Sequence, residues 1–276
     1  MSTADISLPG LKDKTAVVTG GGGAICGAIA RGLATAGARV AIWDISEEAA
    51  DEQADAINSS GGRAIGVTCD VTAQESVETA ATKTSSQLGD VDILINGAGG
   101  SSKEATTSSD LPFFDVQLAD IMTAIGLNYS GTVLCCRALG KGFAERGFGT
   151  ILNIASIGGI KPLTRAIGYS NAKAAVVSFT EWLAVHMATE YSPRIRVNAL
   201  APGFVLTDQN RFLLVDEQTG EPTERGNNII ERVPMARYAE PEEMVGAAMW
   251  LVSDAATYVT GAVVPVDGGL MASLGV

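Results

Sequence analysis

A tyrosine and a lysine four positions apart, Tyr169 and Lys173, are the residues of this sequence best suited to proton transfer. On a helix, this spacing places both side chains on the same face. A tyrosine has an ordinary pKa of about 10, which is too high for a base at neutral pH, but a nearby ammonium favours the phenolate. Ser156 follows an apolar segment and could hold a substrate oxygen beside the phenol. The spacing alone is common, and a solvated lysine beside a packed tyrosine is the alternative interpretation.

A glycine-rich segment, Thr19-Gly20-Gly21-Gly22-Gly23-Ala24-Ile25-Cys26, lies between the first predicted strand and the first predicted helix. Glycines let the backbone approach a pyrophosphate, which is stabilised at the amino end of a helix. The pattern G-x-G-x-x-G does not occur here, so the run by itself predicts only a turn. Its position between strand and helix favours phosphate binding. We expect a dinucleotide to contact Gly20, Gly22, Gly23, Ala24 and Ile25.

Two aspartates follow predicted strands and could bind the adenosine part of such a cofactor. Asp44 ends the second strand, where a carboxylate can accept hydrogen bonds from ribose hydroxyls. Its charge would repel a 2′-phosphate and no basic residue follows it, so we expect NAD(H) rather than NADP. The alternative is an acid that stabilises the amino end of the next helix. Asp70 follows the third strand and could accept from the adenine amino group or cap a loop.

Short apolar runs alternate along the chain with longer helical patterns. The predicted strands are Thr15–Thr19, Arg39–Trp43, Arg63–Cys69, Val91–Ile95, Thr150–Ala155, Ile195–Ala199 and Ala262–Val266. The predicted helices are Ile25–Ala36, Glu47–Ser59, Thr72–Gln87, Leu118–Ile125, Ser130–Arg146, Tyr169–Tyr191 and Pro241–Val252. Continuously apolar strands are typical of a parallel sheet covered on both faces, so the pattern predicts one doubly wound α/β domain over residues 1–276. The stretch 204–237 breaks this rhythm and reads as a substrate lid or a surface excursion.

The charge balance excludes some partners. The chain carries 19 basic and 31 acidic residues, for a net charge of −12. This excess opposes binding to nucleic acids and to anionic membranes. The most apolar long stretch, 174–188, is interrupted by Glu181 and His186, and the amino end lacks the pattern of a signal peptide. We therefore expect a cytoplasmic protein without a membrane span. With four cysteines lacking C-x-x-C spacing and one histidine, we expect no metal site.

These motifs together resemble the short-chain dehydrogenase/reductase family over nearly the whole chain. The resemblance also rests on Asn96-Gly97-Ala98-Gly99, Asn128, Tyr169-Ser170-Asn171-Ala172-Lys173, Pro202-Gly203 with Thr207, and Val266-Asp267-Gly268-Gly269. It implies a Rossmann fold with a seven-stranded sheet and a catalytic tetrad. Within the tetrad, Tyr169 would be the acid/base, Lys173 would tune its pKa and hold the nicotinamide ribose, and Ser156 would bind the substrate oxygen. Asn128 would anchor a water for proton relay.

The resemblance also implies further cofactor contacts. Asn96, Ala98 and Gly99 would line the adenosine side, and Val205 and Thr207 would meet the nicotinamide carboxamide. The expected set is completed by Val71, Pro202 and Gly203.

Three residues depart from the family pattern. Ala24 and Cys26 stand where the family usually has glycine, and Gly97 stands where a second asparagine is common. Cys26 is bulkier than glycine and leaves the geometry of the glycine loop open. It could be a reactive thiol, because a helix amino end lowers a thiol pKa, or a packed and inert one.

Two arginines lie near the predicted reaction centre. Arg165 falls between Ser156 and Tyr169, while Asn210 and Arg211 follow the nicotinamide-contacting segment. Guanidinium groups bind carboxylates in a bidentate manner, so the pair favours a substrate carboxylate. The alternative is that they pair with acids of the lid or of a subunit interface.

Several segments are similar to a subgroup described as D-mannonate oxidoreductases, or fructuronate reductases: ICGAIA, KPLTR, FTEWLAVHMA, APGFVLTDQNR, PTERG and PVDGGLMASLGV. This similarity implies an enzyme that reduces the keto-sugar acid D-fructuronate with NADH. The stretch 101–109 departs from the subgroup pattern. The competing hypotheses are a dehydrogenase for gluconate or for neutral polyols and sugars, and a non-catalytic NAD-binding sensor. The helical segments 130–146 and 169–191 carry extensive apolar stripes, and the resemblance implies that they form four-helix contacts in a homotetramer.

Overall fold

The computed structural model describes residues 8–207, 210–211, 214–216 and 219–273, and it is built on a seven-stranded sheet. All strand pairs are parallel, and the strand order is β3-β2-β1-β4-β5-β6-β7. The strands are β1 (Thr15–Thr19), β2 (Arg39–Asp44), β3 (Arg63–Thr68), β4 (Ile93–Asn96), β5 (Gly149–Ile154), β6 (Ile195–Pro202) and β7 (Val263–Val266). The predicted doubly wound Rossmann fold in a single domain is confirmed.

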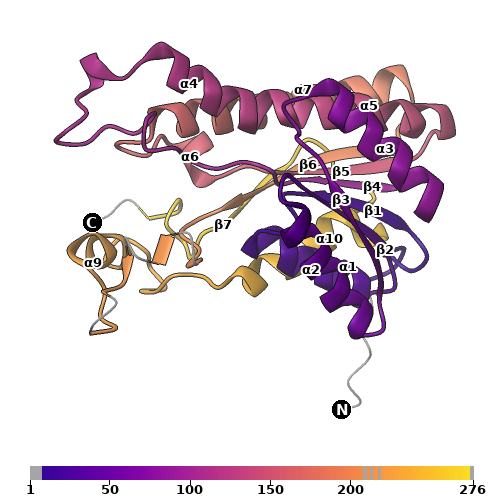
Figure 1. Ribbon diagram of the computed structural model, residues 1–276, viewed down its shortest axis with the longest axis horizontal. Helices are drawn as coiled ribbons and strands as arrows, with labels where there is room; N and C mark the ends of the chain where they lie inside the picture. Colours follow the sequence, from indigo (N-terminus) through magenta and orange to yellow (C-terminus); the bar gives the residue numbers. More distant parts are fainter. Residues whose placement is uncertain (1–7, 208–209, 212–213, 217–218, 274–276) are drawn as a thin grey trace.

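Helices cover both faces of this sheet, in three layers (Figure 1). One face carries α1 (Ala24–Thr35), α2 (Glu47–Ser59) and α10 (Val245–Val252). The other carries α3 (Gln74–Leu88), α4 (Leu118–Ile125), α5 (Gly131–Arg146) and α7 (Ile167–Glu190). Shorter elements are α6 (Ile157–Ile160), α9 (Glu224–Ile230), η1 (Phe113–Asp115), η2 (Gly126–Ser130), η3 (Pro241–Met244) and η4 (Asp254–Ala256).

Alternate residues of each strand pack into different layers. Val18 and Ile42 join the apolar cluster beneath α1 and α10, whereas Val17 and Trp43 join the cluster beneath α3, α5 and α7. Successive side chains of a strand point to opposite faces, so a sheet covered on both sides needs apolar residues at every position. This requirement explains why the strands appear in the sequence as continuous apolar runs.

The strand order places a crevice at the carboxyl ends of β1 and β4. From β1 the chain builds outward to β2 and β3, and from β4 it builds outward in the opposite direction to β7. Ligands of open α/β sheets bind where the order reverses in this way. The glycine loop follows β1 and the 97–100 segment follows β4, so both lie at this point.

The predicted helices differ from the observed ones mainly between residues 118 and 146. Two separate helices were expected there, but α4 and α5 are joined by η2, a single turn of π-helix. The flanking residues Ile125 and Gly131 keep right-handed helical φ and ψ, so the helix does not break. A π-turn adds a residue to a helical turn and is frequent at functional sites. Residue-scale periodicity does not signal such an insertion.

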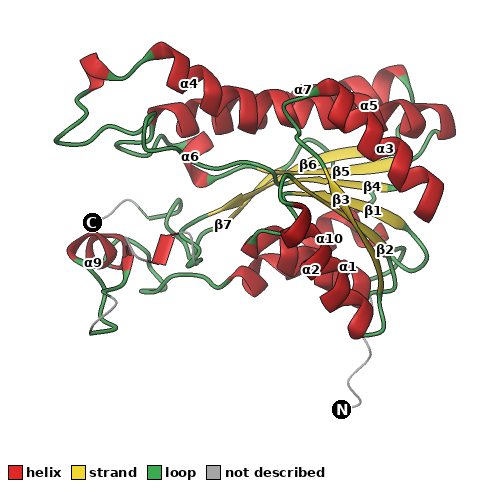
Figure 2. Ribbon diagram, in the orientation of Figure 1, coloured by secondary structure: helices red, strands yellow, loops and turns green. Residues whose placement is uncertain are grey.

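The described parts of the predicted lid region, 204–237, contain the helix α9, helical residues at 210, 211 and 214, and two isolated bridges. Val205 pairs with Ala239, and Val215 pairs with Pro222. Figure 2 shows α6 and α9 at the same side of the molecule as the end of β7. The base of the region docks on the loop after β7, where the Met235 amide donates to the Gly268 carbonyl at 3.1 Å. Among the described residues, no helix is long and apolar enough to cross a membrane.

Candidate active site

Tyr169, Lys173 and Ser156 meet at the carboxyl edge of the sheet. Tyr169 and Lys173 lie in the first two turns of α7, and Ser156 follows β5 and caps α6. The Ser156 hydroxyl is close enough to the Tyr169 phenol to lower the pKa of that phenol, and it accepts from the Gly158 amide at 3.0 Å. The Lys173 ammonium lies 5.7 Å from the centre of the Tyr169 ring. The structure therefore brings together three of the four residues predicted as a tetrad.

Lys173 is almost fully buried, at 4% exposure, although it carries an ammonium group. Its Nζ donates to the Ile154 carbonyl of β5 at 2.8 Å. An ammonium has three donors, so this bond leaves two for other acceptors. Burial lowers the pKa of Lys173 to about 8, and the neighbouring Cys26 thiol opposes that shift. The group can thus act as a hydrogen-bond donor to a cofactor or substrate hydroxyl.

Burial also shapes the chemistry of Tyr169. It raises the pKa of the phenol above 10, while the hydrogen bond with Ser156 lowers it. The sequence led us to expect a phenol pKa lowered by Lys173, but desolvation dominates the shift because the charged form loses contact with water. At neutral pH the phenol is protonated and can donate a proton. To accept one, it needs further positive charge, such as that of an oxidised nicotinamide.

Asn128, the fourth predicted member, lies in the π-turn η2 and is fully buried. Its amide donates to the carbonyls of Ala124 and Gly100, each at 2.9 Å, and its Oδ1 accepts from the Gly100 amide at 3.1 Å. The side chain therefore clamps the loop after β4. A Cβ placed on Gly99 would collide with Asn128 Oδ1 and would lie 3.3 Å from Lys173 Nζ. Asn128 and Lys173 thus lie on either side of Gly99, and no larger residue fits between them.

The glycine loop has the form of an anion-binding turn. Gly20 has a φ of +63°, and a Cβ there would lie 2.9 Å from the Cα of Ala98. Gly23 is the N-cap of α1, where neither a side-chain cap nor an acidic residue occupies the first turn. The free amides and the helix dipole at this end favour an anion. The residues predicted for a pyrophosphate thus fit that group.

Asp44 connects the end of β2 with the glycine loop. Its Oδ2 accepts from the Gly22 amide at 3.0 Å, and its Oδ1 accepts from the Ser46 amide at 3.1 Å. The N-cap of α2 is Ser46, whose hydroxyl accepts from Ala49. Asp44 is therefore not the residue that caps the helix. Asp70 binds the amide and hydroxyl of Thr72 through Oδ1, which agrees with its loop-capping alternative and leaves Oδ2 for a ligand.

Asn96 is buried and its side chain is held by two neighbours. Its amide donates to Asn153 Oδ1 at 2.8 Å and to Cys136 Sγ at 3.2 Å. Asn153 in turn donates to Thr180 of α7 at 2.8 Å. This chain links β4, β5 and α7 beneath the site. Neither Asn153 nor Thr180 was singled out from the sequence, because buried polar residues carry no distinctive spacing.

Thr19 begins the glycine-rich motif, but the sequence assigned it no role. Its hydroxyl accepts from the amides of Gly97 and Ala98, at 3.0 and 3.1 Å. It ties the glycine loop to the loop after β4. Nearby, Gly131 packs against Val71, where any Cβ would lie 2.7 Å from Val71 Cγ2. Val71 is buried at the adenosine end of the predicted site.

The segment predicted to meet the nicotinamide is stiffened by Asn210. The Asn210 side chain accepts from the Thr207 amide at 2.9 Å and donates to the Val205 carbonyl at 2.8 Å. Its amide is thereby committed to backbone groups, which favours a positioning role over direct substrate contact. Upstream, Gly203 lies beside Asp267 after β7, where a Cβ would be 2.7 Å from the Asp267 Cα. Pro202 ends β6.

Arg165 and Arg211 are both exposed, and within the described ranges neither forms an ion pair. Arg165 lies four residues before Tyr169, and its carbonyl accepts from the Thr107 amide at 2.9 Å. The Arg211 amide donates to the Thr207 carbonyl at 2.8 Å. The alternative of pairing with lid acids is therefore not what the described part of the chain shows. Both guanidinium groups are available to a ligand.

The departures from the family pattern fall in a packed region. Cys26 is 5% exposed, and burial raises the pKa of its thiol to about 12. A thiol with such a pKa is not a nucleophile at neutral pH, so the inert alternative describes Cys26. Over the described residues, no group of three or more His, Cys, Asp or Glu side chains could hold a metal ion.

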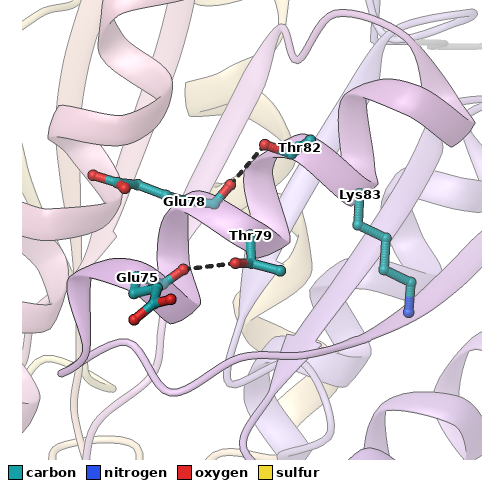
Figure 3. Close-up of a pocket in the computed structure, with 5 residues that line it drawn as sticks. All are labelled: Glu75, Glu78, Thr79, Thr82 and Lys83. Atoms are coloured by element: carbon teal, nitrogen blue, oxygen red, sulfur yellow. Dashed lines mark hydrogen bonds between the residues drawn. The ribbon is translucent and has the colours of Figure 1, made fainter.

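A pocket on the outer surface of α3 offers no competing site. Figure 3 shows its lining, which consists of Glu75, Glu78, Thr79, Thr82 and Lys83. The hydroxyls of Thr79 and Thr82 donate to the carbonyls of Glu75 and Glu78 within the same helix (Figure 3). Lys83 donates to the Gly66 carbonyl. None of the predicted site residues lines this pocket.

Known proteins share this architecture over almost the full chain. The family model described as enoyl-(acyl carrier protein) reductase matches residues 22–271. An uncharacterized oxidoreductase of Bacillus subtilis is 40% identical over 275 residues, covering 96% of this chain and 98% of the relative. A provisionally named D-mannonate oxidoreductase of Haemophilus influenzae, solved with bound NAD, has a TM-score of 0.91 and 38% identity, covering 97% of this chain and 98% of the other.

A second solved structure is a provisionally named NAD(P)-dependent gluconate 5-dehydrogenase of Beutenbergia cavernae with bound NADP. Its TM-score is 0.84 and its identity is 36%, covering 95% of this chain and 98% of the other. Fold, motifs and relatives agree on an oxidoreductase with a nicotinamide cofactor. This chain belongs to the short-chain dehydrogenase/reductase family.

Proposed function

We propose that the chain is an NAD(H)-dependent oxidoreductase that interconverts a ketone and a secondary alcohol in a sugar acid, with D-fructuronate and D-mannonate as the leading pair. The observation that carries the substrate class is that Arg165 and Arg211 are exposed, form no ion pair with any described residue, and lie on the segments that hold Tyr169 and Thr207. In a chain with net charge −12, an anionic substrate needs such a local cationic site. The D-mannonate name of the Haemophilus relative supports the same class.

The proposed chemistry assigns one task to each member of the tetrad. A bound NADH would supply the hydride for the substrate carbonyl carbon. The Tyr169 phenol, whose ordinary pKa of about 10 already keeps it protonated at neutral pH, would donate the proton to the carbonyl oxygen. Ser156 holds that oxygen, and Lys173 directs its two remaining donors to the nicotinamide ribose. Asn128 keeps the loop after β4 in place and supports the proton relay. The Tyr169→Phe variant should bind NADH and lose its oxidation with every active substrate.

The substrate class is tested by an NADH-oxidation screen over keto-acids and ketoses that includes fructuronate. For the best carboxylated substrate, Arg165→Gln or Arg211→Gln should raise KM at least about tenfold, because a charge-assisted pair is lost. In both variants, KM for a neutral ketose should stay unchanged. The control variant Arg63→Gln, on the edge strand β3, should leave KM unchanged for both kinds of substrate. A gluconate dehydrogenase would share the arginine effect but would oxidise NADH best with a ketogluconate. A neutral-polyol enzyme would show no arginine effect at all.

The cofactor preference rests on Asp44. Its carboxylate is fixed at the end of β2 by the Gly22 and Ser46 amides, where it would accept from ribose hydroxyls and repel a 2′-phosphate. We expect kcat/KM to be at least about a hundredfold higher with NADH than with NADPH, and Asp44→Ser to narrow that ratio to within about tenfold. A wild-type preference for NADPH would show that this assignment of Asp44 is wrong.

A further inference from the structure

Two residues that depart from the family pattern, Cys26 and Gly97, lie against each other. Cys26 is in the first turn of α1, and Gly97 directly follows β4. A Cβ built on Gly97 would fall inside the volume of the Cys26 sulfur, and it would lie 3.5 Å from the Cys26 Cβ. The thiol therefore occupies the space that a side chain at position 97 would need. The absence of a side chain at Gly97 thus leaves room for the Cys26 sulfur.

The contact lies between the two loops that flank the cofactor crevice. The Thr19 hydroxyl accepts from the Gly97 and Ala98 amides, and Gly20 approaches the backbone of Ala98. These contacts leave the Gly97 backbone little freedom to move away from α1. A Cβ on Gly97 would also lie 3.0 Å from the Thr19 carbonyl. Any extra volume at position 97 must therefore displace either the sulfur or the loop.

The thiol acts here through its volume. Burial holds its pKa at about 12, so it stays neutral at physiological pH. No disulfide joins Cys26, which is a free cysteine in the described chain. Interiors are close-packed, and added methyl groups force shifts of side chains or backbone. A shift at this place changes the distance between the glycine loop and the loop after β4.

We propose that Cys26 and Gly97 form a matched pair that sets the spacing of the two cofactor-binding loops, with Cys26 as a positioning residue for the adenosine and pyrophosphate part of the cofactor. The inference rests on the proposed cofactor role of these loops. It makes position 97 dependent on position 26: a side chain is tolerated at 97 only when the sulfur is removed.

The experiment is a double-mutant cycle with NADH affinity as the readout. Gly97→Ala should weaken NADH binding roughly tenfold and raise KM for NADH by the same factor, because the overpacked contact moves a loop. KM for the carbonyl substrate should change less than about twofold. In the variant with both Cys26→Ala and Gly97→Ala, the two Cβ atoms are in ordinary contact and only the 3.0 Å approach to the Thr19 carbonyl remains, so most of the lost NADH affinity should return, to within about threefold of wild type. Cys26→Ala alone leaves a void beside Gly97 but creates no clash, so it should weaken NADH binding, though by less than Gly97→Ala does.

A matched control is Gly246→Ala in α10, where an added Cβ meets no atom within 4 Å. It should leave NADH affinity unchanged. The pair is refuted if Gly97→Ala binds NADH like wild type, or if the double variant is as weak as Gly97→Ala. Should Gly97→Ala fail to fold, a folded, NADH-binding double variant supports the pair and an unfolded one refutes it. A wild-type protein that does not bind NADH would instead refute the proposed cofactor, which is a separate result.

Discussion

At the scale of single residues, the burial of Lys173 serves the proposed chemistry but lowers the stability of the fold. The proposed chemistry needs its ammonium next to Tyr169, yet the side chain is 4% exposed and makes one hydrogen bond, to Ile154. Burial lowers the pKa of Lys173 to about 8, whereas an unfolded chain has a lysine pKa of about 10.4. The folded protein therefore holds this proton less tightly than the unfolded chain does. Below pH 8 the charged lysine reduces the stability of the fold.

Replacing Lys173 by methionine should therefore stabilise the protein while abolishing its activity. We expect the free energy of unfolding at pH 7 to rise by about 1–3 kcal/mol, the loss of the bond to Ile154 offsetting part of the gain. The lowered pKa means that wild type regains stability as pH rises from about 8 to above 10, so the gap to the variant should narrow over that range. Urea unfolding at pH 7, 8.5 and 10 measures this gap.

The control for this experiment is Lys103→Met, because Lys103 is exposed in the loop after β4. Its stability relative to wild type should not vary with pH over the same range. A Lys173→Met protein that is less stable than wild type at pH 7, or a gap that stays constant up to pH 10, would contradict the account. Stabilisation with loss of function is typical of residues retained for chemistry.

Residues that share one short segment could be identified from the sequence, and residues that meet across segments could not. Tyr169 and Lys173 lie four apart on one helix, and Ser156 follows a strand, so their order and spacing predicted a common site. The Cys26–Gly97 contact joins residues 71 positions apart. Its geometry depends on how closely α1 approaches β4, which no local pattern encodes. The raised pKa of Tyr169 was missed for the same reason, since burial is a tertiary property.

At the scale of elements, the sequence predicted all seven strands to within two residues at most ends. The strands are buried on both faces and therefore appear as continuous apolar runs, which alternate with longer helical patterns. Both signals can be recognised in the sequence. The two predicted helices on either side of Asn128 match α4 and α5, but the π-turn η2 that joins them was missed, because it preserves helical backbone while adding a residue. That added residue places Asn128 where its amide clamps Gly100. The short helices α6 and α9 were also missed, since four and seven residues are too few for a periodic signal.

The segment after β6 shows how an element can be stabilised without regular structure. Asn210 binds the Val205 carbonyl and the Thr207 amide, and the base of the lid region docks on Gly268. Arg237 adds two hydrogen bonds to Glu243 at the start of η3, and these hold the pKa of that exposed carboxylate at about 2. Hydrogen bonds thus hold the described part of the lid region at both of its ends. The sequence identified the region by its composition alone and gave no such contacts.

At the scale of the whole molecule, α5 and α7 lie on the layer opposite α1 and α10 (Figure 1). A groove between the two helices is lined by apolar and aromatic side chains that include Phe179, Trp182 and Met187. Trp182 stacks on His186, with ring centres 4.8 Å apart, and His186 meets Tyr191 edge-on. Trp182 is 58% exposed and Val185 is 65% exposed. Large exposed apolar patches of this kind mark interfaces.

The homotetramer that the family resemblance implies can be tested on this face. We expect wild type to have about four times the mass of one chain by light scattering coupled to size exclusion. Replacing both Trp182 and Val185 by glutamate would place charges in the apolar contact, and the mass should fall to that of a dimer or monomer. Tyr258→Glu, at a fully exposed tyrosine of the opposite layer's loops, is the control and should keep the wild-type mass. A monomeric wild type, or a double variant that still has the wild-type mass, would show that α5 and α7 do not form the subunit contact.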